Sequence, residues 1–301
     1  MSEVARHGTA ERAKARASVV LLGLLWGLNW PAVRIALGDL TPWSLRASCL
    51  GVGALAVFAL ARLRRRPLTV PPGRPRLHLA VLGLLNVAFF NLLIAFSQLA
   101  TATSRAAIVT YTMPIWTTLL ARLVLGERLT RRRILALALG AAGIAILSLP
   151  LATAGFPVGI LYALGAGLSW AAGTVYLKWA RIVADPIAIA AWQLAFGALA
   201  VACGMAIFEG VPHLWPLHPA VIAAVIYHAL LGIGLAYFLW FEIIARLPAS
   251  TAALGTLLVP VVGVLSAMLL LGERPTVPDI VGFVLVFAAA ASVILQPNGQ
   301  S

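Results

Sequence analysis

The chain has 301 residues, of which 62% are hydrophobic and 10% are charged, and its formal net charge is +13. Soluble domains carry roughly 25% charged residues, so this chain has too little charge to cover a water-facing surface of its size. The positive charge alone could suggest a nucleic-acid partner, but the basic residues stand in short clusters between long apolar runs. That arrangement is typical of membrane proteins, so we expect a lipid bilayer around the chain and no nucleic acid bound to it.

Ten apolar segments follow one another along the chain, each close to the ~20 residues that a membrane-spanning helix needs. They run over residues 18–37, 43–61, 77–99, 103–125, 133–149, 158–178, 186–208, 219–244, 248–271 and 277–295. None of them alternates polar and apolar residues as a strand of a membrane β-barrel does. The sequence therefore predicts an all-α integral membrane protein with ten transmembrane helices.

The lysines and arginines predict the orientation of these helices. Most of them fall in the N-terminal tail or in every second connection, as the runs Arg64–Arg66 and Arg131–Arg133 do, whereas the other connections hold few, such as Arg274. Cytoplasmic connections carry the excess of basic residues. We therefore expect a multi-pass protein of the inner cell membrane, with cytoplasmic tails at residues 1–17 and 296–301.

The phrase LGER occurs twice, at Leu125–Arg128 after the fourth segment and at Leu271–Arg274 after the ninth. Five crossings separate the two copies, and an odd number of crossings puts them on opposite sides of the membrane. Three arginines follow the first copy closely and none follows the second, as expected if only the first faces the cytoplasm. The sequence thus predicts two inverted five-helix halves, at residues 18–149 and 158–295, around a central cavity.

A five-helix repeat that ends in LGER, with Pro114 or Pro260 about twelve residues earlier, resembles the EamA-type branch of the drug/metabolite transporter superfamily. The likeness covers nearly the whole chain. It implies ten helices, inverted halves and a cavity that opens to alternate sides of the membrane. Within this branch the tryptophan-rich first segment and the length look closest to the aromatic amino acid exporters called YddG.

Polar and aromatic residues inside the apolar segments are the candidates for the cavity wall. They offer amide and hydroxyl hydrogen bonds beside aromatic surface, which suits a small zwitterion with an apolar side chain. The alternative for each is a structural role, because tryptophans gather at the membrane interface and buried asparagines tie helices together. The candidates are Trp26, Asn29, Trp30, Asn91, Tyr111, Trp170, Thr174 and Tyr237.

Two further pairs have candidate mechanical roles. Glu242 lies within the eighth segment, one turn before Arg246, and the two form either an interfacial ion pair or a gate or proton-coupling site. Pro114 and Pro260 lie mid-helix at matching positions of the two halves. A proline removes a backbone donor there, so each is either a static kink or a hinge of its half.

These observations predict a transporter that exports small metabolites, most of all neutral and aromatic amino acids. A proton-coupled exporter of drugs or other metabolites is the alternative, and an intramembrane enzyme is a distant one, because no nucleophile and base stand together within a segment. The histidines have no carboxylate or cysteine at metal-binding spacing, so we expect no metal site and no cofactor. The expected partners are a small-molecule substrate and lipid, and the expected functional unit is a monomer.

Overall fold

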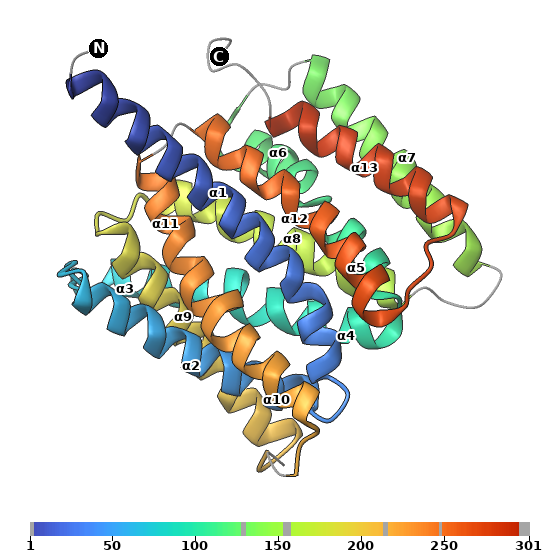
Figure 1. Cartoon of the computed structure of the whole chain (residues 1–301), viewed down its shortest axis with the longest axis horizontal. Helices are drawn as coiled ribbons and strands as arrows, with labels where there is room; N and C mark the ends of the chain where they lie inside the picture. Colours follow the sequence, from blue (N-terminus) through green and yellow to red (C-terminus); the bar gives the residue numbers. More distant parts are fainter. Residues whose placement is uncertain (1–2, 128–130, 153–157, 213–215, 247–248, 295–301) are drawn as a thin grey trace.

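A computed structural model describes residues 3–127, 131–152, 158–212, 216–246 and 249–294 (Figure 1). Within these ranges all regular structure is helical and no strand is present, which confirms the predicted all-α class. The helices pack side by side in one bundle. The first residues of α1 and the last residues of α13 lie toward the same end of that bundle (Figure 1).

Each expected apolar segment coincides with one helix or with a run of consecutive helices. The elements are α1 (Glu3–Ala36), α2 (Pro42–Leu63), α3 (Arg74–Leu82), η1 (Gly83–Phe89), α4 (Phe90–Ala100), α5 (Thr103–Thr110), α6 (Met113–Val124), α7 (Arg131–Ala152), α8 (Val158–Ala180), α9 (Pro186–Phe208), α10 (Pro219–Ile226), η2 (Tyr227–Leu235), α11 (Ala236–Arg246), α12 (Ala249–Leu271) and α13 (Val277–Ile294). The expected tail at residues 1–17 is mostly helical, because α1 begins at Glu3.

Seven described stretches are long and apolar enough to cross a membrane, by length and composition. They are Ala17–Ala36, Pro42–Leu63, Arg74–Ala100, Thr103–Val124, Val158–Ala180, Pro186–Phe208 and Pro219–Ile243. Shorter apolar stretches inside α7, α12 and α13 occupy the positions of the other three expected segments: Ile134–Leu147, Leu258–Leu271 and Val277–Ala289. The chain is therefore a multi-pass membrane protein.

Proline and acidic residues explain where several helices begin. Pro42, Pro186 and Pro219 each occupy the first turn of a helix, where the missing N–H has no intrahelical partner to lose. Asp185 precedes α9, and its side chain accepts a hydrogen bond of 2.8 Å from the backbone N–H of Ile187. These local signals place helix starts at the segment edges that the sequence predicts.

The third and eighth segments share an interruption that the sequence does not predict. A π-helical stretch, η1 or η2, lies between two α-helices in each of them, at matching positions of the two halves. π-Helical turns are rare and often occur at functional sites. Both stretches contribute residues to the cavity described below, among them Asn86 from η1 and Gly232 and Ile233 from η2.

The fourth segment is broken, and this corrects the expected mid-helix position of Pro114. α5 ends at Thr110, and Pro114 lies in the first turn of α6. A proline at position 114 cannot donate to the carbonyl of Thr110, so the helix is free to turn there. The hydroxyl of Thr112 donates to the carbonyl of Val109 at 2.8 Å and holds the turn. Pro260, by contrast, lies inside the continuous helix α12, as expected.

Polar contacts between the connections show which connections lie at the same end of the bundle. Arg66 follows α2 and bonds Asp185 before α9 and Glu242 in α11, which defines the Arg66 end. Glu273 follows α12 and accepts hydrogen bonds from the backbone N–H groups of Thr103 and Ser104 at the start of α5. These contacts define the Glu273 end. The sorting agrees with helices that cross the bundle in alternating directions.

Two close contacts between helices lie near the cavity, and each joins an asparagine to a glycine. The repeat relates the asparagine of one contact to the glycine of the other. Asn29 of α1 packs against Gly232 of η2, and Asn86 of η1 packs against Gly173 of α8. A β-carbon at either glycine would overlap the asparagine side chain, so only glycine fits there. Asn29 matches Gly173 in the repeat, as Trp26 matches Trp170. Asn86 matches Gly232, as Asn91 matches Tyr237.

Candidate functional site

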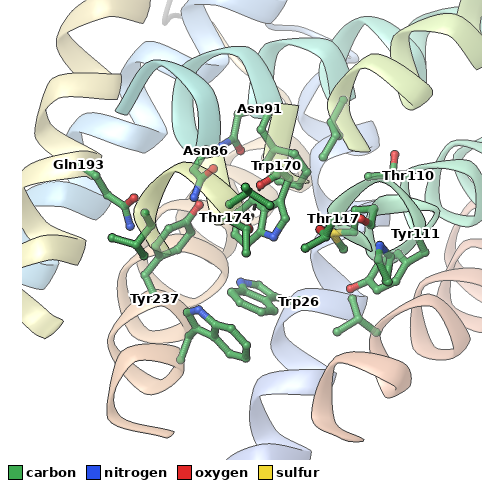
Figure 2. Close-up of a pocket in the computed structure, with 18 of the residues that line it drawn as sticks. Trp26, Asn86, Asn91, Thr110, Tyr111, Thr117, Trp170, Thr174, Gln193 and Tyr237 are labelled. Carbon is green, nitrogen blue, oxygen red and sulfur yellow. Dashed lines mark hydrogen bonds between the residues drawn. The ribbon is translucent and has the colours of Figure 1, made fainter. Parts of the chain in front are cut away.

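A cavity of about 680 Å³ lies inside the bundle, between helices of both halves. Its wall is formed mainly by α1, η1, α4, α6, α8, η2 and α11. Figure 2 shows aromatic and amide side chains from these elements around an open space. The volume lies within the ~300–1,000 Å³ of small-molecule sites, so a molecule of amino-acid size fits inside.

Aromatic rings form one side of this cavity. Trp26 is at their centre, with ring-centroid distances of 6.5 Å to Trp170, 6.2 Å to Tyr237 and 5.7 Å to Trp240. Phe90 extends the group through Trp170, at 4.7 Å. Trp26 and Trp170 occupy matching positions of the two halves and meet edge to face. The rings offer an apolar surface with exposed π-faces to a ligand.

All eight residues that the sequence proposes for the cavity lie on its wall. They are Trp26, Asn29, Trp30, Asn91, Tyr111, Trp170, Thr174 and Tyr237. Figure 2 shows Trp26, Trp170 and Tyr237 grouped on one side and Tyr111 on the other. Their role in binding a substrate stays a prediction.

The wall also contains a buried arginine from the second apolar segment. Arg46 lies in α2, is 1% exposed and contributes to the cavity lining. Its Nη1 donates to Asn91 Oδ1 at 3.2 Å and lies 2.7 Å from His228 Nε2. His228 Nδ1 lies 2.7 Å from Asn29 Oδ1. The four side chains connect α1, α2, α4 and η2 beside the cavity.

The donor and acceptor roles in this network follow from the arginine. A guanidinium only donates, so His228 Nε2 accepts and carries no proton. The proton is then on Nδ1, which donates to Asn29 Oδ1. Asn91 accepts from Arg46 through Oδ1 and donates through Nδ2 to the carbonyl of Val87 at 2.9 Å. The histidine therefore forms a neutral link between the guanidinium of Arg46 and the amide of Asn29.

Several buried polar atoms of the lining residues have no hydrogen-bond partner in the described part of the chain. Gln98 shows the pattern: its Nε2 donates to the carbonyl of Trp30 at 2.9 Å, while its Oε1 is without a partner. Native proteins leave few such atoms without a partner, so a cluster of them at one site is suited to bind a polar ligand or water. The atoms are Arg46 Nε, Asn86 Oδ1, Gln98 Oε1, Thr110 Oγ1 and Gln193 Oε1.

The cavity lining continues toward the Arg66 end. It includes Glu127 of the first LGER phrase and Lys178 at the end of α8, which form an ion pair at 2.5 Å. Neither Glu242 nor Arg66 belongs to the lining. Arg66 donates to Glu242 at 2.9 Å, and the side chain of Arg246, the partner expected from the sequence, lies outside the described residues.

Sequence reasoning misses Arg46, Asn86, Gln193 and Trp240 as wall residues. For Arg46 a signal exists, because an arginine inside an apolar segment with no acid one turn away is unusual. Asn86 and Gln193 are amides inside the expected apolar segments, and the same reasoning that selects Asn91 would select them. His228, one of the histidines weighed as metal ligands, lies within hydrogen-bond distance of Arg46 and Asn29.

Comparisons with known proteins agree with this architecture. The EamA-like transporter family model matches residues 14–149 and again residues 157–295. The chain is 28% identical to a probable amino-acid metabolite efflux pump of Salmonella typhimurium, over 89% of this chain and 91% of that protein. It is 26% identical to a probable terminal-alkyne amino-acid exporter of Streptantibioticus cattleyicolor, over 96% of each.

A solved structure shares the fold. It superposes with a TM-score of 0.64 and 22% sequence identity, over 92% of this chain and 96% of the other. The family and the names of the relatives indicate membrane transporters and no enzyme. Two matches to one family model cover most of the residues, and the cavity lies between them: the chain belongs to the EamA-like transporter family.

Proposed function

We propose that the protein is an alternating-access exporter of neutral and aromatic amino acids in the inner cell membrane. Ten helices form two inverted halves, and both chain ends face the cytoplasm. The observation that carries the proposal is the central cavity, with the Trp26 ring group on one side and amide and hydroxyl groups around it. Two relatives whose names refer to amino-acid export support the substrate class.

Three features support the inverted arrangement. The π-helical stretches η1 and η2 lie at matching positions. The repeat relates the Asn29–Gly232 contact to the Asn86–Gly173 contact, with asparagine and glycine interchanged. The Arg66 end and the Glu273 end hold alternate connections along the chain. Inverted halves around a site near the middle of the membrane are the usual basis of alternating access.

Flux in proteoliposomes tests the proposal. Purified protein should accelerate the release of labelled phenylalanine, tryptophan and leucine above the rate of empty vesicles. Trp170→Ala should lower this flux about tenfold or more, because about 1.4 kcal/mol of lost binding is a factor of ten. Trp179→Ala, which removes a half-exposed tryptophan outside the cavity, is the matched control and should keep the flux.

Two results would oppose the proposal. Equal flux with and without protein, for all three amino acids, would contradict the proposal that the protein transports neutral and aromatic amino acids. Normal flux in folded Trp170→Ala and Asn91→Ala variants would show that the cavity wall is not where the substrate binds.

A further inference from the structure

The charge of Arg46 has no counter-charge among the described residues. The chain has nine acidic residues, and Glu3 and Glu11 lie in the N-terminal stretch whose side chains are outside the described part. Every other carboxylate has a partner elsewhere. Asp185 and Glu242 bind Arg66, Glu127 binds Lys178, Asp279 binds Arg105, Glu209 and Glu273 accept from helix starts, and Asp39 accepts from the backbone of His218.

A buried guanidinium without an anion is costly in a membrane protein. Charged side chains within membrane-spanning helices are rare and pair with other groups or mark a substrate path. The neutral partners His228 and Asn91 both bind Nη1 of Arg46, and Nε is left without a partner. The network therefore fixes the guanidinium in place but does not neutralise it.

We propose that Arg46 binds the carboxylate of the transported molecule, so that the cargo is an organic acid with an aromatic or apolar side chain. This inference rests on the proposed function and names the group by which that site selects its substrate. Arginine presents several N–H donors in a planar fork that matches a carboxylate. Arg46 and the Trp26 ring group line the same cavity.

The cavity wall is less selective for the amino group of a substrate than for its carboxylate. Glu127 is the one carboxylate in the described lining, and Lys178 already neutralises it at 2.5 Å. Amide oxygens such as Gln98 Oε1 and Gln193 Oε1 and the ring faces can receive an ammonium group without requiring one. The carboxylate is therefore the essential group, and the ammonium group is tolerated.

Four phenyl compounds separate these contributions. They compete with labelled phenylalanine for flux in proteoliposomes: phenylalanine, 3-phenylpropanoate without the amine, phenylalaninamide without the carboxylate, and phenethylamine. The first two should inhibit at similar concentrations. The last two should need at least about 30-fold more, the low end of the effect of removing one partner of a buried charged pair.

Variants of α2 assign this preference to one residue. Arg46→Gln should bring the four inhibition constants to within about threefold of one another, whereas Arg46→Lys should keep the order with weaker binding. Arg62→Gln makes the same change at an exposed position of the same helix and should keep the full preference. Folding of each variant is checked by its elution as a monodisperse species in detergent.

The outcomes separate this inference from the proposed function. If the parent protein carries phenylalanine but the amide and the amine compete as well as the acids, the carboxylate site is overturned and transport stands. A folded Arg46→Gln variant with the parental preference overturns it as well. If the parent protein carries no amino acid, transport fails, and thermal-shift titration of the purified protein with the four compounds decides on the carboxylate site. If Arg46→Gln does not fold, the compound series on the parent protein and on Arg46→Lys decides instead.

Discussion

Helices α2 and α9 meet at both ends of the bundle, and different polar groups join them at each end. At the Glu273 end, Glu209 beyond α9 accepts hydrogen bonds directly from the backbone N–H groups of Trp43 and Ser44, at 3.2 and 2.9 Å. At the Arg66 end, the start of α9 is capped by its own Asp185. Arg66 beyond α2 then binds that aspartate at 3.0 Å.

In the inverted arrangement that we propose, the difference would follow from the unlike sides of the membrane. The geometry of the junction is kept, but a basic residue is used at one end and an acidic residue at the other. Basic residues gather in cytoplasmic connections. The run Arg64–Arg66 lies at the Arg66 end, whereas the Glu273 end holds single arginines such as Arg105 and Arg274. The two LGER phrases differ in the same way, since arginines follow only the first.

Labelling from the two sides of the membrane tests the comparison most directly, with an all-or-none result. Single cysteines replace Arg64 and Arg274, which are exposed at opposite ends, in a variant that lacks Cys49 and Cys203. Arg274→Cys should react with an impermeant maleimide in intact cells. Arg64→Cys should react only after permeabilisation. Reaction of both from one side would end the inverted arrangement.

Removing one contact at each end should show that the Glu273 end is held more firmly. Glu273→Ala removes a charged cap from the first two N–H groups of α5, at 2.6 and 2.9 Å, and should cost about 1–2 kcal/mol of unfolding free energy. Lys178→Ala breaks an ion pair whose lysine is 67% exposed and should cost under about 0.5 kcal/mol. Denaturant titrations in detergent measure both, and equal losses would contradict the distinction.

The two prolines should shift the resting conformation in opposite directions. Pro114 lies in the first turn of α6, next to the break in the fourth segment, and Pro260 lies inside α12. If each allows its half to bend, Pro114→Ala and Pro260→Ala should favour opening at opposite ends. Spin-label distances across the Arg66 end and across the Glu273 end measure this. Distances unchanged from the parent in both variants would make the prolines static kinks.

Glu242→Gln should have the smallest effect, with most of the downhill flux kept. Glu242 lies outside the cavity lining, and Arg66 keeps Asp185 as a partner when the charge is removed. The measurement is amino-acid flux without a pH gradient, with Glu209→Gln at the other end as a matched substitution. Complete loss of flux in a folded Glu242→Gln protein would make this carboxylate central to transport.

Hydropathy predicts the helices because apolar length is a local property of the sequence. The wall residues Trp26, Asn91 and Tyr237 could be predicted for a related reason, since polar and aromatic groups on one face of an apolar helix need a shared interior. Arg46 could not be placed in this way. An arginine one turn from a helix end usually extends its charge to the interface, and its burial here depends on His228 and Asn91 from distant segments.

The interruptions of the helices also depend on distant parts of the chain. Pro114 predicts a disturbance in the fourth segment, but the turn before it is held by a hydrogen bond from Thr112 and lies against Gly167 of α8. Nothing in the sequence of η1 or η2 alone predicts π-helical turns. Glu242 has a partner that its own segment does not predict, because the structure brings Arg66 to it from the end of α2.

The exchanged contacts Asn29–Gly232 and Asn86–Gly173 carry information about ancestry. Two matches to one family model imply that the halves descend from a single sequence, in which both contacts were identical. Both asparagines now lie in the first half, and both glycines lie in the second. If only one member of a contact is replaced by the other residue type, two asparagines meet in a space that holds one side chain, or two glycines meet and leave a gap between the helices. Each asparagine of the first half therefore requires a glycine in the second half, and chimeras that join one half to a relative's other half should fold only where each asparagine still faces a glycine.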